Sequence, residues 1–402
     1  MMHLFINGLG ASAGGGLTYL ANVLPHLSNA GVRTTLAVTP EFPAVTPESH
    51  ERVEYLRIPS GGSAARRFWR EQRNLPKLVL DCRADVLLSA GNFALRRSPV
   101  PQILLSRNSL YTSAEFYRDL LARGEYRMWV ENRIKGALAR RSIRWADRTV
   151  APSAAFAGVL ERWTNKPVIA SHHGFDPDFF SASEGSLPPA LRQKLDLPTG
   201  TLRVLLVSHY NYYRNFETVF RAITKFKEEK GAPDIRLLLT CELKKSKTPG
   251  AYNPESAARL IAELGLRDQV VELGAVPYEQ LHHVYRASHI FVTAAYTETF
   301  AHPLVEAMSC GLPVIASDLP VHREICADAA LYFPRFSPEA LAGELWQFAS
   351  SRMLYDSLSL AGRERSRYFS WRSHVERLLC IAEELLGATS LDSAAAHAMS
   401  AA

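Results

Sequence analysis

The feature that most limits the fold of this chain is the alternation of short apolar strands with helical patterns along almost its whole length. The predicted strands are 3–7, 34–39, 85–90, 102–106, 148–152 and 168–171 in the first half, and 203–208, 235–240, 269–273, 289–294 and 313–317 in the second. Such alternation predicts an α/β protein with parallel sheets. A chain of 402 residues is too long for one ordinary hydrophobic core, so we predict two domains.

A turn-rich stretch without periodicity at 181–190 is the best candidate for the boundary between the domains. We predict an N-terminal domain at 1–180, a linker at 181–200 and a C-terminal domain at 201–370. An amphipathic helix at 371–387 follows the second sheet, and the Ala- and Ser-rich tail at 388–402 is expected to be disordered.

Composition indicates a soluble globular protein, with 47% hydrophobic and 21% charged residues. No apolar run approaches the roughly 18–20 residues that a membrane-spanning helix needs. The segment Met1–Asn7 reads as a first strand without a basic leader, so no secretory signal is expected. The five cysteines are scattered and odd in number, which favours reduced thiols and a cytoplasmic location.

Two glutamates lie eight positions apart in the segment Glu298–Gly311, where a predicted strand gives way to a short helix. Pro303 suits the first turn of that helix, and Gly311 suits its end. Four backbone amides are expected to lie unpaired at the positive end of the helix dipole, those of Thr299, Phe300, Ala301 and His302. This arrangement suits an anion held between two carboxylates that read hydroxyl groups. The spacing alone is also consistent with a surface helix that carries two solvated glutamates.

The longer stretch Glu298–Glu324 closely resembles the signature of the family 4 retaining glycosyltransferases. These enzymes have the GT-B fold, in which two Rossmann-like domains face a cleft and the last helix crosses back onto the N-terminal domain. One core position departs from the family pattern, because Ala301 stands where the family usually has Gly. The resemblance implies that Glu306 accepts hydrogen bonds from both ribose hydroxyls of the nucleotide and that Glu298 reads a hydroxyl of the donor sugar.

A glycine-rich loop follows the first strand. The spacing of Gly8, Gly10 and Ala13 matches the dinucleotide-binding fingerprint, which needs an acid about 20 residues later. The first acid here is Glu41, about 30 residues beyond Gly10, so a dehydrogenase is disfavoured. A purely structural turn is another interpretation of the loop. The family resemblance assigns three of its residues to the edge of the donor diphosphate and the acceptor, namely Gly14, Gly15 and Gly16.

Other predicted site residues rest on the same resemblance. Family members usually carry Arg and, five residues later, Lys after the first strand of the second domain, and both contact the diphosphate. This chain has His209 and Arg214 there, and the alternative is an ordinary polar loop. Many members place a His after the fourth or fifth strand of the first domain, where this chain has Arg107 and Asn108. Val276 is also included among the predicted donor-binding residues.

No metal or other cofactor is expected. Asp176-Pro-Asp178 is the closest match to the Asp-x-Asp pair of metal-dependent sugar transferases, and in the resemblance it belongs to a structural turn. His172 and His173 precede it, but adjacent side chains on a strand point to opposite faces and so cannot both reach one ion.

Positive charge is concentrated in one part of the chain. The net charge is +6, and the stretch Arg118–Arg148 holds nine Lys or Arg against four acids, with Trp129 and Trp145 among them. A second basic stretch surrounds Trp69. Such a face suits reversible attachment to anionic lipid, although a solvated face is an equally good interpretation. No nucleic-acid recognition motif accompanies the charge, so no nucleic-acid partner is expected.

These observations predict a retaining, metal-independent glycosyltransferase that moves a hexose from a UDP- or GDP-linked sugar to a glycan or lipid-linked glycan. Cell-surface polysaccharide biosynthesis is the expected setting. The alternative is a sugar-nucleotide-binding protein of the same fold with little or no turnover. His209, Asn108 and Ala301, the three departures from the family pattern, motivate that alternative.

Overall fold

The computed structural model describes residues 1–11, 15–42, 52–59, 64–175, 177, 180, 187–245 and 251–400. The chain forms two compact units. The first comprises Met1–Thr112, Val130–Gly174 and Ser370–Ala402, and the second comprises Ser113–Trp129 and Phe175–Phe369.

The first unit contains a parallel sheet of seven strands in the order β3-β2-β1-β4-β5-β6-β7. Along the chain the strands are β1 (His3–Asn7), β2 (Arg33–Val38), β3 (Val53–Arg57), β4 (Val86–Ser89), β5 (Gln102–Leu105), β6 (Arg148–Ala151) and β7 (Ile169–Ala170). The main helices are α1 (Gly15–Asn29), α2 (Ala64–Asp81), α4 (Tyr126–Trp145), α5 (Ala154–Thr164) and α15 (Trp371–Ser400).

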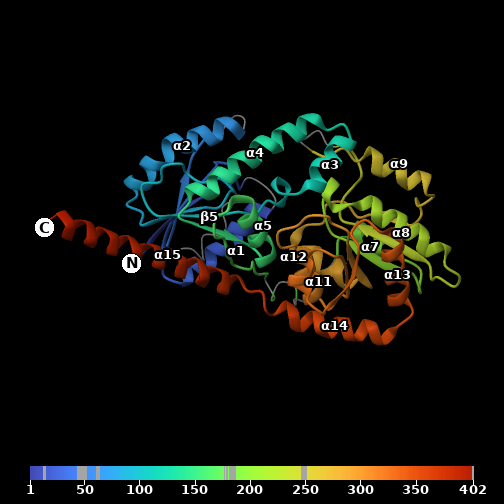
Figure 1. Ribbon diagram of the computed structural model, residues 1–402. Coiled ribbons are helices and arrows are strands. Elements are labelled where there is room, and N and C mark those ends of the chain that lie inside the picture. Colours follow the sequence, from blue (N-terminus) through green and yellow to red (C-terminus); the bar gives the residue numbers. More distant parts are fainter. Residues whose placement is uncertain are drawn as a thin grey trace. The chain divides into compact units, whose positions relative to one another are not determined.

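Both faces of this sheet are buried, as alternate side chains of β1 show. Leu4 and Ile6 pack in a core with α1 and α15, while Phe5 packs in a second core with residues of α2. In Figure 1, α15 starts beside α1, and the two helices are in contact. Residues between Trp371 and Leu386 therefore complete the core of the first unit.

The second unit contains a parallel sheet of six strands in the order β10-β9-β8-β11-β12-β13. The strands are β8 (Leu202–Leu206), β9 (Ile235–Leu239), β10 (Val270–Glu272), β11 (Ile290–Thr293), β12 (Val314–Ser317) and β13 (Ala330–Phe333). This is the order of a Rossmann-type sheet, with its switch point between β8 and β11.

Nine α-helices of six to fifteen residues belong to the described part of the second unit. They are α3 (Ala114–Ala122), α7 (Pro189–Leu195), α8 (Phe216–Glu228), α9 (Glu255–Glu263), α10 (Leu281–Arg286), α11 (His302–Ser309), α12 (Pro320–Cys326), α13 (Pro338–Ala349) and α14 (Arg352–Ser366). Figure 1 shows α8 and α13 near one another, and these helices are in contact.

The predicted fold class is confirmed, since both sheets are parallel and every predicted strand is present. Three boundaries differ from those predicted. The segment Ser113–Trp129 clusters with the second unit instead of the first. The predicted linker contains the helix α7, and 181–186 lie outside the described residues. Helix α15 continues to Ser400 instead of ending near 387, because the Ala-rich tail has high helix propensity.

Candidate functional site

The switch point of the second sheet brings together two of the predicted site residues. Arg214 lies in the loop after β8, and Glu298 lies in the loop after β11, the neighbouring strand. Arg214 Nη1 donates to Glu298 Oε2 at 2.5 Å. The two side chains are only 19% and 11% exposed, so this ion pair is largely shielded from solvent. The sequence predicted both residues but did not predict that they pair.

The electrostatics of this pair keep both groups charged. Burial alone would raise the pKa of Glu298, but Arg214 and a hydrogen bond from the Thr299 amide hold it below its usual value. Burial would lower the pKa of Arg214, but Glu298 outweighs that effect and raises it. Nε of Arg214 is buried without a hydrogen-bond partner in the described structure. A buried, unpaired guanidinium N–H is a donor that an anionic ligand could use.

The two loops are joined by their backbones as well as by the ion pair. Asn215 adopts a left-handed conformation (φ 54°) at the start of α8, and its Nδ2 donates to the Ala294 carbonyl at 3.2 Å. The Tyr296 amide donates to the Tyr213 carbonyl at 3.0 Å. The neighbours of Arg214 are thus fixed to the neighbours of Glu298.

The start of α11 differs in part from the prediction. The Thr299 amide was expected to be unpaired, but it donates to Glu298 Oε1 at 3.0 Å. Ala301 has φ 64°, a left-handed conformation that favours Gly. This backbone requirement explains why a Gly is usual at this position of the family motif. Phe300 is buried and stacks against Phe369, so it can face a ligand only through its backbone.

Glu306 lies inside α11 and is 6% exposed. The Tyr285 hydroxyl donates to Glu306 Oε2 at 2.7 Å. Burial raises the pKa of Glu306 to about 7, although the Tyr285 hydrogen bond acts in the opposite direction. The carboxyl group is therefore only partly ionised near neutral pH, in contrast to Glu298.

The remaining predicted residues of the second unit are less enclosed. His209 is exposed, and His302 and Val276 are half-buried. The His209 carbonyl accepts a hydrogen bond from the Ser208 hydroxyl at 2.6 Å. A small cavity beside the ion pair is lined by Arg214 and Ala301 together with apolar residues of β8, β11 and α11.

Two of the predicted residues of the first unit lie at the start of α1, and Asn108 follows β5. Gly14 lies outside the described residues, and Gly15 and Gly16 open α1. Gly16 packs closely, since a Cβ there would lie 3.0 Å from the Ala11 Cα. Arg107 Nη1 donates to the Gly15 carbonyl at 3.0 Å. Asn108 caps a short 3₁₀ helix, and its side chain accepts from the Leu110 amide at 3.0 Å.

Of the two histidines that were considered as metal ligands, His173 packs in the protein interior. His173 is 3% exposed and its ring lies 5.3 Å from that of Trp371 at the start of α15. The adjacent Asp176 and Asp178 lie outside the described residues.

Sequence reasoning missed His322, which lies in α12 within the stretch that carries the family signature. It is fully buried, and its Nδ1 is hydrogen-bonded to the Ser317 carbonyl at 2.8 Å. Burial lowers the pKa of His322 to about 4, so the ring is neutral at physiological pH. The charge of Glu298 acts to raise the pKa of His322 and that of Arg214 acts to lower it, and both effects are smaller than that of burial. A His at this position of the motif is the only sequence signal that could have drawn attention to it.

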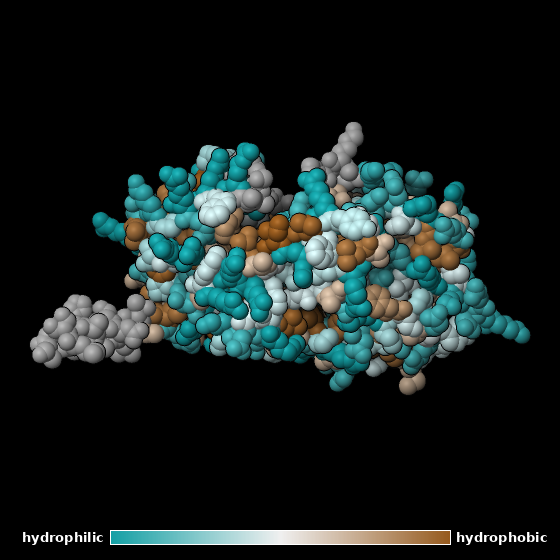
Figure 2. Space-filling view, turned by 45° about the horizontal axis from the view of Figure 1, so that its top comes forward, coloured by the Kyte–Doolittle hydropathy of each residue, from teal (hydrophilic) through white to brown (hydrophobic). Residues whose placement is uncertain are grey.

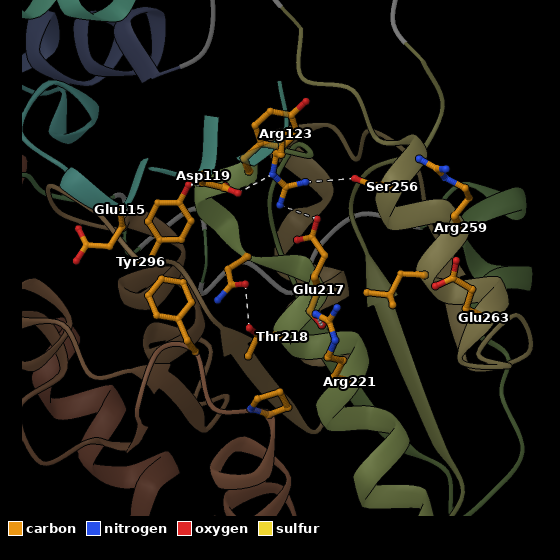
Figure 3. A pocket seen from close by; sticks show the side chains of 15 residues that line it. Glu115, Asp119, Arg123, Glu217, Thr218, Arg221, Ser256, Arg259, Glu263 and Tyr296 are labelled. Carbon is orange, nitrogen blue, oxygen red and sulfur yellow. Dashed lines mark hydrogen bonds and ion pairs between the residues drawn. The ribbon is translucent and has the colours of Figure 1, made fainter. Parts of the chain in front are cut away.

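A cavity of about 650 Å³ lies elsewhere in the second unit and was not predicted. Figure 3 shows its walls, formed by side chains of α3, α8 and α9 together with Tyr296. Arg123 extends into it and contacts Asp119, Glu217 and Ser256. Arg123 was counted in the predicted basic face, but its side chain is only 22% exposed and is held between two carboxylates.

The rest of the predicted basic face is more accessible. Arg140, Arg141 and Arg144 are exposed on α4, and Trp69 on α2 is 71% exposed. On the face drawn in Figure 2, hydrophobic residues form several small patches among mostly hydrophilic ones. No helix in the described part of the chain has the length and apolar character needed to span a membrane.

Two Rossmann-type sheets, with the buried Arg214–Glu298 ion pair at the switch point of the second, define a two-domain α/β protein of the GT-B class. Solved structures of this class match nearly the whole chain. Sucrose-phosphate synthase from Thermosynechococcus elongatus has a TM-score of 0.74 at 18% identity, covering 96% of this chain and 100% of that one. Anabaena HepE in complex with UDP-glucose has a TM-score of 0.71 at 14% identity, with the same coverage.

Family models identify the protein more closely. The model described as Glycosyltransferase Family 4 matches residues 13–179, and the model described as Glycosyl transferases group 1 matches residues 189–365. The chain therefore belongs to the group 1 glycosyltransferases of family 4.

Curated relatives are similar over part of their length. D-inositol 3-phosphate glycosyltransferase of Mycolicibacterium smegmatis is 30% identical over 214 residues, which is 52% of this chain and 45% of the relative. The enzyme of the same name from Streptomyces scabiei is 28% identical over 235 residues, 57% of this chain and 52% of the relative. The O-antigen chain mannosyltransferase B of Escherichia coli is 31% identical over 114 residues, 28% of this chain and 30% of the relative. The chain spans about half the length of the first two relatives.

Proposed function

We propose that this protein is a retaining glycosyltransferase that moves a hexose from a nucleotide sugar to a glycan or lipid-linked glycan without a bound metal. The observation that carries the proposal is the buried Arg214–Glu298 pair at the switch point, with Nε of Arg214 unpaired. Switch points are where Rossmann-type sheets bind nucleotides. The family membership and the UDP and UDP-glucose of the HepE structures support a UDP-sugar as donor.

In the proposed reaction, the bond between the anomeric carbon and the diphosphate oxygen breaks while the acceptor oxygen bonds to that carbon on the same face. The acceptor proton passes to the leaving phosphate. Negative charge grows on the diphosphate, and we expect Arg214 to stabilise it, with a smaller contribution from His209. Glu298 stays ionised, which suits it to accept a hydrogen bond from a sugar hydroxyl.

Glu306 is proposed to accept hydrogen bonds from the ribose hydroxyls. Its partner Tyr285 orients the carboxyl group before any ligand arrives. Because Glu306 is partly protonated near pH 7, we expect affinity for the nucleotide to rise between about pH 6 and 8, as the acceptor form becomes more abundant.

A donor-hydrolysis assay with a panel of nucleotide sugars tests the proposal. Release of nucleoside diphosphate that continues in excess EDTA is the expected result. Loss of turnover on chelation, restored by manganese, would disprove the metal-free mechanism. Tight binding without any turnover would favour the alternative of a sugar-nucleotide-binding protein.

Calorimetric titration tests the roles of the two glutamates. Glu306→Gln should weaken binding of the free nucleoside diphosphate, while Glu298→Gln should leave that binding intact and reduce turnover. Equal loss of nucleotide binding in both variants would remove the assignment.

The proposed lipid-linked acceptor rests on the exposed basic residues of α4 and on Trp69. Adsorption to vesicles with anionic lipid should be reversible and weakened by salt, because exposed charges are screened within about 8 Å at physiological ionic strength. Charge reversal at Arg140, Arg141 and Arg144 should lower this adsorption and leave donor hydrolysis unchanged. If the wild-type protein does not bind vesicles with anionic lipid, a soluble acceptor becomes the better proposal.

A further inference from the structure

The segment Ser113–Trp129 belongs to the second unit, although the chain on both sides of it belongs to the first. It contains α3 and the first residues of α4. Its charged side chains form the wall of the large cavity that carries Asp119 and Arg123 (Figure 3). The contacts of this segment reach both loops that carry the Arg214–Glu298 ion pair.

One set of contacts reaches the loop that carries Glu298. The Tyr296 hydroxyl donates to Asp119 Oδ2 at 2.9 Å. Asp119 Oδ1 in turn accepts from Arg123 Nε at 2.7 Å. Tyr296 lies two residues before Glu298, and its ring is 4% exposed. The hydrogen bond to Asp119 therefore fixes a buried side chain of this loop to α3.

A second set reaches the loop that carries Arg214. Arg123 Nη2 donates to Glu217 Oε1 at 3.0 Å, and its guanidinium lies 4.3 Å from the centre of the Tyr212 ring. The Tyr212 hydroxyl donates to Glu125 Oε1 at 2.7 Å. Tyr212 and Glu217 flank Arg214 on either side, two and three residues away.

A third contact acts through Asn215. Arg335 Nη2 donates to Glu115 Oε1 at 2.7 Å, and the Arg335 carbonyl accepts from Asn215 Nδ2 at 2.7 Å. The same Asn215 amide also donates to the Ala294 carbonyl. The segment is thus bonded to both loops of the ion pair and to a third loop that supports them.

These bonds are strong enough to position the loops because they are charged and partly buried. The side chains of Asp119 and Arg123 are each 22% exposed, and that of Glu217 is 12% exposed. Hydrogen bonds to ionised groups are roughly twice as strong as neutral ones, and shielding from water strengthens them further.

We propose that Asp119 and Tyr296 are positioning residues that hold Glu298 and Arg214 in the geometry required for sugar transfer. This inference rests on the proposed function of the ion pair. Their proposed effect passes through the Tyr296–Glu298 loop and its backbone bond to Tyr213. A displacement of about 1 Å in a catalytic group can cost about 100-fold in rate.

The test compares Tyr296→Phe, Asp119→Asn and the double variant. Tyr296→Phe keeps the buried ring and removes only the hydroxyl that binds Asp119. We expect kcat for sugar transfer to fall by about tenfold or more in each variant, while the Kd of the nucleoside diphosphate changes by less than about threefold. The double variant should lose little more than Asp119→Asn alone, because Asp119→Asn already weakens the bond to the Tyr296 hydroxyl together with the ion pair to Arg123. A purely structural role would lower Tm without this split between kcat and Kd.

Arg118→Ala is the matched control. Arg118 lies on the same helix, but its side chain is 75% exposed and points to solvent apart from a 3.7 Å contact with Glu115. Its turnover should match that of the wild type. Unchanged kcat in folded Tyr296→Phe and Asp119→Asn would overturn the inference.

A second measurement does not depend on turnover. Urea unfolding of Asp119→Asn, Glu298→Gln and their combination gives the coupling between the two positions. If the two positions were independent, the change in the unfolding equilibrium constant of the double variant would equal the product of the two single changes. We expect the measured constant to differ from that product by more than about twofold. Strictly independent effects would overturn the inference. A wild-type protein without turnover would instead refute the proposed function, and the coupling would still decide whether Asp119 acts on Glu298.

Discussion

Glu306 makes the stability of the protein depend on pH. Burial raises its pKa to about 7, whereas an unperturbed glutamate has a pKa of 4.5. As pH rises from 4.5, the unfolded chain releases the Glu306 proton before the folded chain does. Stability therefore falls through this interval, and the full cost of the buried carboxyl group is present above about pH 7.

Glu306→Gln should remove this pH dependence, because an amide has no proton to lose and can still accept from Tyr285. We expect the variant to gain stability over the wild type by up to about 3 kcal/mol at pH 8 and by little at pH 4.5. Urea unfolding at the two pH values measures this. Glu263→Gln, at an exposed position of α9, is the control and should show no such difference. Equal gains at both pH values would contradict the prediction.

Arg214 and Glu298 depend on each other for their stability as well as for their proposed chemistry. Arg214→Ala should destabilise the protein by about 3–5 kcal/mol near pH 7, because it leaves the buried Glu298 carboxylate unpaired. The loss should shrink as pH falls and Glu298 becomes protonated. Adding Glu298→Gln should restore most of the lost stability.

The exposed pair Arg372–Glu376 supplies the control for this experiment, since its side chains are 78% and 59% exposed. Arg372→Ala should cost less than about 1 kcal/mol. If Arg214→Ala lowered the free energy of unfolding no more than Arg372→Ala does, burial of the Arg214–Glu298 pair would not make the two residues depend on each other.

The start of α11 carries a strain that one substitution can relieve. Ala301 occupies a left-handed conformation, which costs a non-glycine residue about 1–2 kcal/mol. Ala301→Gly should be neutral or stabilise the protein by up to about 1 kcal/mol, after the entropy cost of glycine is subtracted. Ala307→Gly, inside the same helix, should destabilise it by at least about 1 kcal/mol. Thermal unfolding of both variants checks this contrast, and the same sign for both would contradict it.

Most of the strands could be predicted because parallel strands buried on both faces are continuous apolar runs. The two strands that were missed lie at sheet edges. Strand β3 (Val53–Arg57) is partly exposed along its length, with Glu54 and Arg57 facing solvent. Strand β13 (Ala330–Phe333) has only four residues. Strand β3 therefore lacks the continuous apolar run of the central strands, whereas β13 is such a run and was not predicted.

The candidate site could be predicted only where a local motif carries it. The motif located Glu298 and Glu306 and marked Ala301 as a departure from the family's Gly, but the left-handed backbone of Ala301 was not predicted. It could not show that Arg214 pairs with Glu298, because these residues are 84 positions apart. Asp119 and Tyr296 are 177 positions apart, and nothing near Asp119 in the sequence marks it as a partner of the second sheet. The first pairing is set by the order of the strands β8 and β11 and the second by the packing of α3 on the second unit, and local spacing encodes neither.

Neither compact unit is a continuous piece of chain. The first unit needs α15, whose apolar side chains pack against α1 and the first sheet. The second unit takes Ser113–Trp129 from within the predicted first domain. A single cut near 181–200 would therefore leave each half without an element that it needs, so isolated halves are expected to fold poorly.

Truncation tests the part that α15 plays in the whole protein. Deletion of 371–402 removes several buried side chains from the first core, those of Trp371, Val375, Leu378, Ile381 and Leu385. It also removes His374, which is hydrogen-bonded to the Tyr19 hydroxyl at 3.0 Å. Since loss of one large core side chain costs about 2–5 kcal/mol and a domain has only about 5–15 kcal/mol of stability, the first unit should unfold. Deletion of 388–402 keeps all of these side chains and should leave Tm nearly unchanged. Limited proteolysis should cut the variant that lacks 371–402 rapidly within 1–174, and it should leave the variant that lacks 388–402 intact. Equal resistance of the two variants would show that α15 is dispensable.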